Sequence, residues 1–253
     1  MEIKSINIIG AGNVAFYLVH KLSPQICVRT VYSRDVSHAL ILAQKASAQA
    51  VDRISELSLE VDLNIICVKD DAIKAIVEQL PKSITTIHTS GAIDISMLSK
   101  FEKSGIIYPL QSISKERIAS LGAVPFLIEA SSASFEKELL EFVQKYFSTN
   151  SIMADSRTRL RIHLAAVFAN NFTNFFLGKS KDILDEIGVS FRILEPLMIE
   201  TIKKAFETDP KKSQTGPAKR RDKDTVEIHK NILKDERIRE IYVLISRLIE
   251  NEV

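Results

Sequence analysis

The feature that most constrains this chain is a glycine-containing turn that directly follows a short apolar run near the N-terminus. Apolar residues 6–9 lead into the hexapeptide Gly10-Ala11-Gly12-Asn13-Val14-Ala15. In such a G-x-G-x-x-A turn the first glycine permits a tight bend, and the second leaves room for a pyrophosphate. The helix that follows offers free N–H groups to the anion. The pattern predicts a Rossmann-type βαβ unit in which the first five residues of the hexapeptide bind a nicotinamide dinucleotide. The alternative is a degenerate turn in a domain that has lost its ligand.

Strand-like and helix-like segments alternate along the first part of the chain. Strands are expected at residues 3–9, 26–32, 63–68, 84–88, 105–108, 126–128 and 151–153. Helices are expected at residues 13–22, at 36–45, from Asp70 onward and at 135–147. Such alternation is typical of a doubly wound, mainly parallel sheet with helices on both faces.

The pattern changes after Asp155, where strand signals end. Helices are expected at residues 157–187 and 191–207, from about Thr225, and from Asp235 to the end. The fold class predicted is therefore α/β, with a Rossmann-type domain over residues 1–153 and an all-helical domain over residues 154–253.

The end of the second strand carries information on the cofactor. A site for NAD usually places a carboxylate about 20 residues beyond the glycines. Here Ser33 and Arg34 stand at that place. A hydroxyl and a guanidinium suit a 2′-phosphate, so the pair predicts NADP, with NAD less favoured. Two alternatives are an Arg34 on a solvent-facing loop, and Asp35 reaching a ribose unless it caps the next helix.

Further candidates follow later strands, at the edge where ligands bind in such folds. Val68 and Lys69 are expected near the cofactor, whereas Asp70 or Asp71 is expected to cap the next helix. His88, with Ser90 beside it, is a candidate for orienting a carbonyl or carboxylate and for contacting the cofactor. The alternative is a turn in which hydroxyls bond the backbone. After the next strand, Gln111 is expected to face the same cleft.

The long helix of the second domain carries polar side chains among apolar ones. His163, Asn170 and Asn174 lie on one stripe at helical spacing. Buried amides and imidazoles need partners, which a substrate, one another or a dimer mate could supply. A later loop, QTGPAKRRD, contains Thr215, Arg220 and Arg221 and either closes over an anionic substrate or is a solvated linker.

Composition excludes several classes of protein. A net charge of +2 implies neither nucleic acid nor a membrane surface as partner. No apolar run approaches the roughly 20 residues that span a bilayer. No signal peptide is expected, and two cysteines on separated strands predict a reduced, cytoplasmic protein. No cysteine or histidine pair has the spacing of a metal site.

Six segments in order resemble a bacterial family: GAGNVA, VKDDAI, HTSGAI, YPLQSIS, HLAAVFANNF and QTGPAKRRD. Its members carry a Rossmann-like domain and a helical domain of unknown function, and are labelled NADP oxidoreductases. The arrangement is similar to ketopantoate reductase, pyrroline-5-carboxylate reductase and the β-hydroxyacid dehydrogenases, and the helical part to the 6-phosphogluconate dehydrogenase C-terminal domain. The resemblance implies a homodimer with its active site between cofactor domain and helical domain.

The chain departs from these relatives where they carry their proton donor. Ketopantoate reductase and the β-hydroxyacid dehydrogenases use a lysine with an asparagine one turn later on the first long helix. Here His163 is followed one turn later by Val167.

We therefore predict hydride transfer between NADPH and a small anionic keto acid or imine. In this hypothesis His163 is the general acid, Asn170 orients the substrate, and Arg220 or Arg221 holds its carboxylate. The rival hypothesis is a non-catalytic NADP(H)-binding sensor or assembly module.

Overall fold

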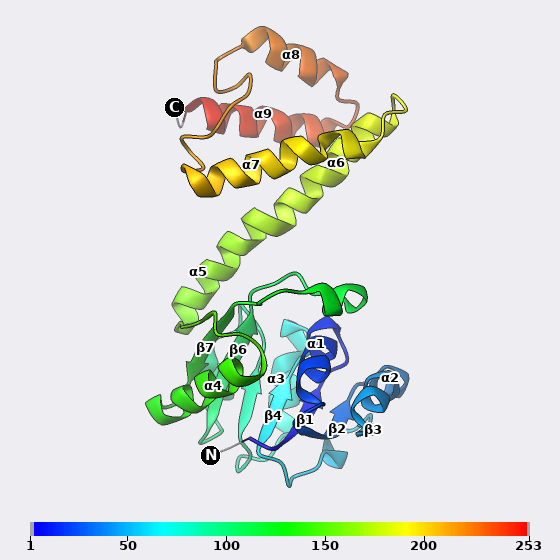
Figure 1. Cartoon of the computed structure of the whole chain (residues 1–253), viewed down its shortest axis with the longest axis vertical. Coiled ribbons are helices and arrows are strands. Elements are labelled where there is room, and N and C mark those ends of the chain that lie inside the picture. The colour runs from blue at the N-terminus through cyan, green and yellow to red at the C-terminus, as the bar shows by residue number, and fades with distance from the viewer. Residues whose placement is uncertain (1–2, 252–253) are drawn as a thin grey trace. The chain divides into compact units, whose positions relative to one another are not determined.

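The computed structural model describes residues 3–251, which divide into two compact units, one up to Phe175 and one from Phe176 onward. The first contains a sheet with its helices and the start of a long helical segment, and the second contains only helices (Figure 1). Each unit is described by itself. A domain boundary after residue 153, where strand signals end, stays a prediction.

The first unit is built on an eight-stranded sheet. In spatial order the strands are β3 (Gln49–Val51), β2 (Cys27–Tyr32), β1 (Ser5–Ile9), β4 (Leu63–Ile66), β5 (Thr86–His88), β6 (Ser104–Pro109), β7 (Phe126–Ala130) and β8 (Ser151–Met153). All neighbouring pairs are parallel except β6 and β7. This confirms the predicted fold class. The sequence did not indicate β3, which is only three residues long.

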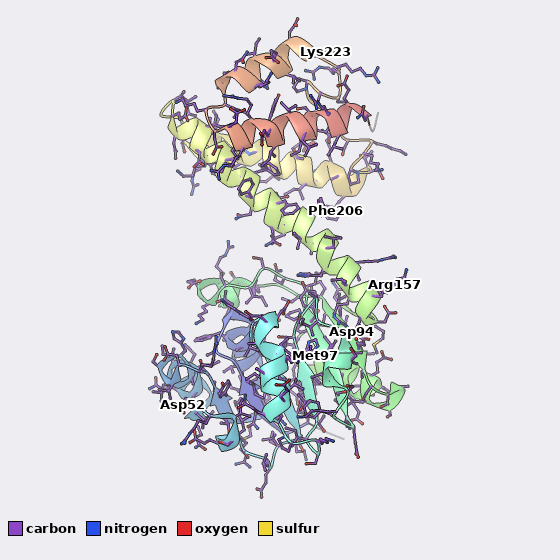
Figure 2. The ribbon with its side chains drawn as sticks, turned by 180° about the vertical axis from the view of Figure 1, so that it is seen from behind. Asp52, Asp94, Met97, Arg157, Phe206 and Lys223 are labelled. Carbon is purple, nitrogen blue, oxygen red and sulfur yellow. The ribbon has the colours of Figure 1, made fainter. Side chains whose placement is uncertain are left out.

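Helices cover both faces of the sheet, as comparison of Figures 1 and 2 shows. The four helices are α1 (Asn13–Leu22), α2 (Val36–Ala46), α3 (Asp70–Gln79) and α4 (Ala133–Tyr146). Ile8 belongs to the core shared with α1, α2 and α4, whereas Ile9 belongs to the core shared with α3. Successive side chains of a strand point to opposite faces, so a nearly continuous apolar run serves both cores.

Two helix starts differ in how they are capped. Asp35 caps α2, because its carboxylate accepts a hydrogen bond from the Ser37 amide at 2.9 Å. The expectation that Asp70 or Asp71 caps α3 is wrong. Lys69 occupies the cap position without a side-chain hydrogen bond, and the two carboxylates lie within the first turn. There they still favour the positive end of the helix dipole.

The long helical segment consists of α5 (Ser156–Ala166), the π-helical η4 (Val167–Phe172) and α6 (Thr173–Asp185). A π turn contains one residue more than an α turn and is found mostly as a short insertion, frequently at functional sites. Gly188, with φ of +68°, lies just beyond the segment, in a conformation that glycine often adopts after the end of a helix.

The rest of the second unit is helical. It contains η5 (Phe191–Leu194), α7 (Glu195–Glu207), α8 (Lys223–Ile232) and α9 (Glu236–Asn251). No residue between 176 and 251 is fully buried. Among the residues described, no helix is both long and apolar enough to cross a membrane.

Candidate active site

The glycine turn lies at the floor of a cleft of about 360 Å³ at the carboxyl edge of the sheet. Gly10 adopts φ of +129°, a conformation that residues with side chains rarely adopt. A Cβ atom there would lie 2.3 Å from the backbone oxygen of Cys67. Gly10 is therefore required for the close approach of β1 to the end of β4.

Gly12 faces free space instead. A Cβ atom placed on Gly12 would meet no protein atom within 4 Å. Gly12 is also the N-cap of α1, with no side chain bonded to the helix end and no acidic residue in the first turn. The exposed N–H groups and the open space above Gly12 suit a pyrophosphate, so this turn fits a dinucleotide.

The charges around the cleft fit a cofactor with several phosphates. Its lining comprises Gly10, Ala11, Gly12, Tyr32, Ser33, Arg34, His38, Cys67, Val68, Lys69, Ala72, Ile76 and Lys115. Three of these are permanent cations, and none is a carboxylate. Asp35 is engaged by Ser37, whose amide and hydroxyl donate to it and lower its pKa. The alternative of Asp35 on a ribose is therefore disfavoured, and Ser33 with Arg34 is left at the end of β2.

Several residues predicted to bind cofactor stand in this cleft, and others do not. Val68 and Lys69 are part of the lining, whereas Asn13, Val14 and Ser90 are not. His38 and Lys115 were missed by the sequence analysis. His38 lies on the first turn of α2, close to Arg34 in the sequence, and this proximity was a signal that could have identified it. Lys115 comes from a connection that is distant in the sequence.

His88 lies inside the protein, and the expectation that it faces the open edge is wrong. Its Nδ1 accepts a hydrogen bond from the Ser90 amide at 3.1 Å. Ser90 Oγ in turn accepts from the amides of Ala92 and Ile93, so this segment is the backbone-bonded turn considered as the alternative. Burial, followed by the charge of Arg159, lowers the pKa of His88 to about 3. His88 is thus held neutral.

A second cavity, of about 550 Å³, lies between the end of β6 and the long helical segment within the first unit. Its lining comprises Tyr108, Leu110, Gln111, Ser112, Ile162, His163, Ala165, Ala166, Val167, Ala169, Asn170 and Asn171. His163, Asn170 and Gln111 line this one cavity, which is separate from the cleft at the glycine turn. Its polar side chains are hydroxyls, amides and one imidazole, with no lysine or arginine.

Tyr108 and His163 form a hydrogen-bonded pair in this cavity. The Tyr108 hydroxyl lies 2.9 Å from His163 Nδ1, and the rings meet edge to face with centroids 5.6 Å apart. Burial, and to a lesser degree the charge of Asp70, raises the pKa of Tyr108. The phenol therefore retains its proton and can take part in proton transfer with the imidazole.

Gly91 makes room for the pair. A Cβ atom there would lie 2.8 Å from His163 Nδ1 and 2.9 Å from Tyr108 Cζ. The HTSGAI segment therefore contributes to this cavity through its glycine, while His88 and Ser90 shape the turn. Tyr108 was not among the predicted residues; its position at the end of a strand was the signal that could have identified it.

The π-helical η4 changes which amides accompany His163. Asn170 and Asn171 line the cavity, but Asn174 does not. The stripe expected from 3.6-residue spacing holds for Asn170 but not for Asn174, because the wider π turn shifts the residues that follow it.

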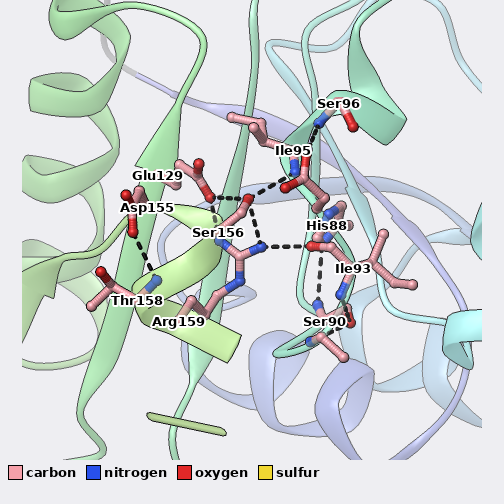
Figure 3. A network of polar contacts seen from close by, with 12 residues as sticks. His88, Ser90, Ile93, Ile95, Ser96, Glu129, Asp155, Ser156, Thr158 and Arg159 are labelled. Carbon is pink, nitrogen blue, oxygen red and sulfur yellow. Dashed lines mark hydrogen bonds and ion pairs between the residues drawn. The ribbon is translucent and has the colours of Figure 1, made fainter. Parts of the chain in front are cut away.

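A buried ion-pair network fixes the start of α5 against the sheet (Figure 3). Arg159 is fully buried and donates to Glu129 of β7, to the Ile93 carbonyl at 2.5 Å and to Ser156 Oγ at 3.1 Å. Ser156 Oγ also donates to Glu129 at 2.8 Å. His163 is one helical turn beyond Arg159, so this network positions the His163 side of the cavity.

The remaining substrate candidates belong to the second unit. Thr215 lines an apolar groove of about 420 Å³ there, and Arg221 lines a separate cavity. Arg220 lies in neither. Their role in holding an anionic substrate stays a prediction. Among residues 3–251, no three histidine, cysteine, aspartate or glutamate side chains are grouped so that they could hold a metal.

Comparison with known proteins identifies the family. Residues 5–97 match the family model described as NADP oxidoreductase, coenzyme F420-dependent, and residues 124–249 match a domain of unknown function, DUF2520. BF3122 from Bacteroides fragilis, designated an NADP oxidoreductase, is 33% identical, with 98% of each chain covered and a TM-score of 0.87. The chain belongs to this NADP oxidoreductase family. The resemblance noted from the six segments is confirmed.

Other solved structures share the fold at lower identity. TM1727 from Thermotoga maritima is 22% identical, with 98% of this chain and 97% of that chain covered and a TM-score of 0.70. The reductive aminase from Aspergillus terreus, in complex with NADPH and ethyl-5-oxohexanoate, is 14% identical, with coverage of 99% and 93% and a TM-score of 0.70. No curated protein matches the chain.

As a member of this family the chain is an NADP-dependent oxidoreductase. The predictions of an enzyme and of NADP are confirmed, and the glycine turn and the cationic cleft have the geometry and charge that suit this cofactor.

Proposed function

We propose that this oxidoreductase reduces the C=O or C=N bond of a small keto acid or imine, and that Tyr108 and His163 together supply the proton. The observation that carries the proposal is their 2.9 Å hydrogen bond inside a cavity lined by neutral polar groups. A nicotinamide cofactor supplies the hydride when bound. The protein must then provide orientation and one proton.

The pair can deliver that proton in either of two arrangements. If Tyr108 donates to His163 Nδ1, the imidazole carries its proton on Nε2 and offers it from there. If His163 Nδ1–H donates to the Tyr108 oxygen, the phenol offers its own proton. In both arrangements the second member compensates for the charge that develops on the donor.

The amides around the pair suit the unreacted part of a substrate. Gln111, Asn170 and Asn171 can donate and accept hydrogen bonds, so they can orient a carbonyl, amine or carboxylate. Arg220 and Arg221, both exposed, belong to the second unit, and their role toward a carboxylate stays a separate prediction. The reductive aminase with the same fold was solved with NADPH and a ketone ester, in keeping with carbonyl or imine reduction.

The test is NADPH consumption with a panel of keto acids and cyclic imines. On any accepted substrate, Tyr108→Phe and His163→Asn should each lower kcat by roughly 100-fold or more, as for loss of a general acid. NADPH binding measured by calorimetry should be unchanged. Tyr146→Phe is the matched control, because it removes a half-buried hydroxyl of α4 outside the cavity.

If both variants turn over like the wild type, the proton-donor assignment fails. If the wild-type protein binds NADPH but consumes none across the panel, the proposed reduction fails and the rival hypothesis of a cofactor-binding sensor or assembly module is favoured.

We also propose that a second copy of the chain covers the helical unit. Large apolar side chains of this unit are exposed, among them Ile193, Leu197, Ile199, Ile202 and Phe206. A unit of this size with no buried side chain lacks the core that a stable domain needs. A second copy presents the same apolar surface, so two copies in a symmetric dimer could bury it mutually.

A further inference from the structure

Lys115 reaches the cofactor cleft from a part of the chain remote from the glycine turn. It is the first residue of the short helix η3 (Lys115–Ser120), in the connection between β6 and β7. It lines the cleft together with Gly10, Gly12 and Arg34. The six segments that carry the family resemblance do not include it.

The connection that carries Lys115 is anchored in the main core. Ile118 of η3 is buried, and Ile113 and Leu121 pack against the same core as α1. The Leu110 amide donates to the Pro125 carbonyl at 2.8 Å, which joins the two ends of the connection. The position of Lys115 therefore follows from packing, although its side chain is exposed.

The ammonium group of Lys115 lies over the ring of Phe16, a residue near the start of α1. Its Nζ is 4.1 Å from the centroid of the Phe16 ring, a favourable cation–π distance. Phe16 is one helical turn after Gly12, and its amide donates to the Gly12 carbonyl at 3.0 Å. Arg34, in contrast, follows β2, where the sequence predicts recognition of a 2′-phosphate.

The charge of Lys115 is available to a ligand. Within the described chain no carboxylate lies within ion-pair distance of its Nζ, and the cleft lining contains no acidic residue. A flexible ammonium with free donors can bind phosphate oxygens as a point charge.

From this placement we infer that Lys115 binds the cofactor pyrophosphate across the first turn of α1, while Ser33 and Arg34 select the 2′-phosphate. Phe16 is a positioning residue that holds the ammonium through its ring. The role of Lys115 does not depend on which substrate is reduced.

The experiment measures the dissociation constants of NADPH and NADH by calorimetry. Both cofactors contain the pyrophosphate, and only NADPH contains the 2′-phosphate. Lys115→Met should raise the dissociation constants of NADPH and NADH by a similar factor of about tenfold. A loss of this size is in the range for a hydrogen bond to a charged group. Lys115→Arg should retain most of the affinity. Arg34→Gln should weaken NADPH alone.

Lys45→Met on α2 is the matched control, because Lys45 is exposed and outside the cleft. Its affinities should equal those of the wild type. If Lys115→Met binds both cofactors like this control, or loses affinity for NADPH only, the assignment to the pyrophosphate is overturned.

Phe16→Leu tests the positioning role. In the wild-type background it should weaken the binding of both cofactors. In the Lys115→Met background it should have no further effect on either dissociation constant. Additive losses would show that Phe16 acts independently of Lys115, which would overturn that part of the inference.

Discussion

Gly10 and Gly12 are two residues apart in one turn but are required for different reasons. A side chain on Gly10 would collide with the backbone of Cys67, so this glycine belongs to the packing of the sheet. A Cβ atom on Gly12 would meet nothing within 4 Å beyond its own neighbours, so the packing of the protein does not require a glycine there, whereas a bound pyrophosphate would. A substitution of Gly12 is therefore expected to affect cofactor binding, whereas a substitution of Gly10 is expected to affect folding.

At the same scale, His88 links stability to pH. Its folded-state pKa of about 3 is below the ordinary value of 6.5, so the unfolded chain binds the proton more readily. The stability that the neutral His88 contributes is therefore fully present above about pH 6.5 and is lost as the pH falls toward 3. Between pH 6.5 and 5 the free energy of unfolding should fall by about 1–2 kcal/mol from this residue.

Urea denaturation followed by circular dichroism at several pH values measures this slope. His88→Gln, which cannot take up the proton, should be nearly insensitive to pH in this window. The variant His38→Gln, which removes an exposed histidine of α2, should keep the wild-type slope. Equal slopes for the wild type and His88→Gln would contradict the prediction.

At the scale of elements, the start of α5 is held by a buried ion pair. Arg159 and Glu129 are both largely removed from water, and Ser156 and the Ile93 carbonyl accept further hydrogen bonds from the guanidinium. Breaking such a pair leaves a buried charge without its partner. Arg159→Met should therefore lower the free energy of unfolding by about 3–5 kcal/mol.

The double variant Arg159→Met/Glu129→Met should recover a large part of this loss, because it removes both charges. Arg157→Met on the same turn changes an exposed side chain (Figure 2) and should have little effect. Chemical denaturation measures all three. An Arg159→Met variant as stable as Arg157→Met would show that the network does not stabilise the fold.

At the scale of the whole molecule, the exposed apolar surface of the helical unit predicts association. The chain has a mass of 28.4 kDa, and sedimentation equilibrium should give twice this value. The double variant Ile199→Glu/Ile202→Glu on α7 should sediment as a monomer, because buried unpaired carboxylates are costly at an interface. Glu200→Lys, on the same helix, should remain a dimer. A monomeric wild type would refute the proposal.

Local sequence patterns were sufficient to predict the structure where one short segment contains all the residues that determine it. The hexapeptide from Gly10 to Ala15 contains the turn, the open space and the helix start. Alternating strand and helix signals likewise predicted a mainly parallel sheet, which the structure confirms. Even the preference for NADP rests on neighbouring residues, Ser33 and Arg34, at the end of a single strand.

The cavity of Tyr108 and His163 is built from segments that are remote in the sequence. Tyr108 at the end of β6 lies against His163 of α5, and Gly91 leaves room for both. The π turn in η4 then places Asn171 in the cavity in place of Asn174.

His88, at the end of a strand, was expected at the open edge of the sheet but is buried. Lys115 reaches the cleft at the glycine turn from the connection between β6 and β7. The sequence by itself determined the glycine turn that suits a dinucleotide, because its geometry is local. Only tertiary packing decided which side chains line the cavity of Tyr108 and His163, because their distances are set by contacts between elements that no short pattern encodes.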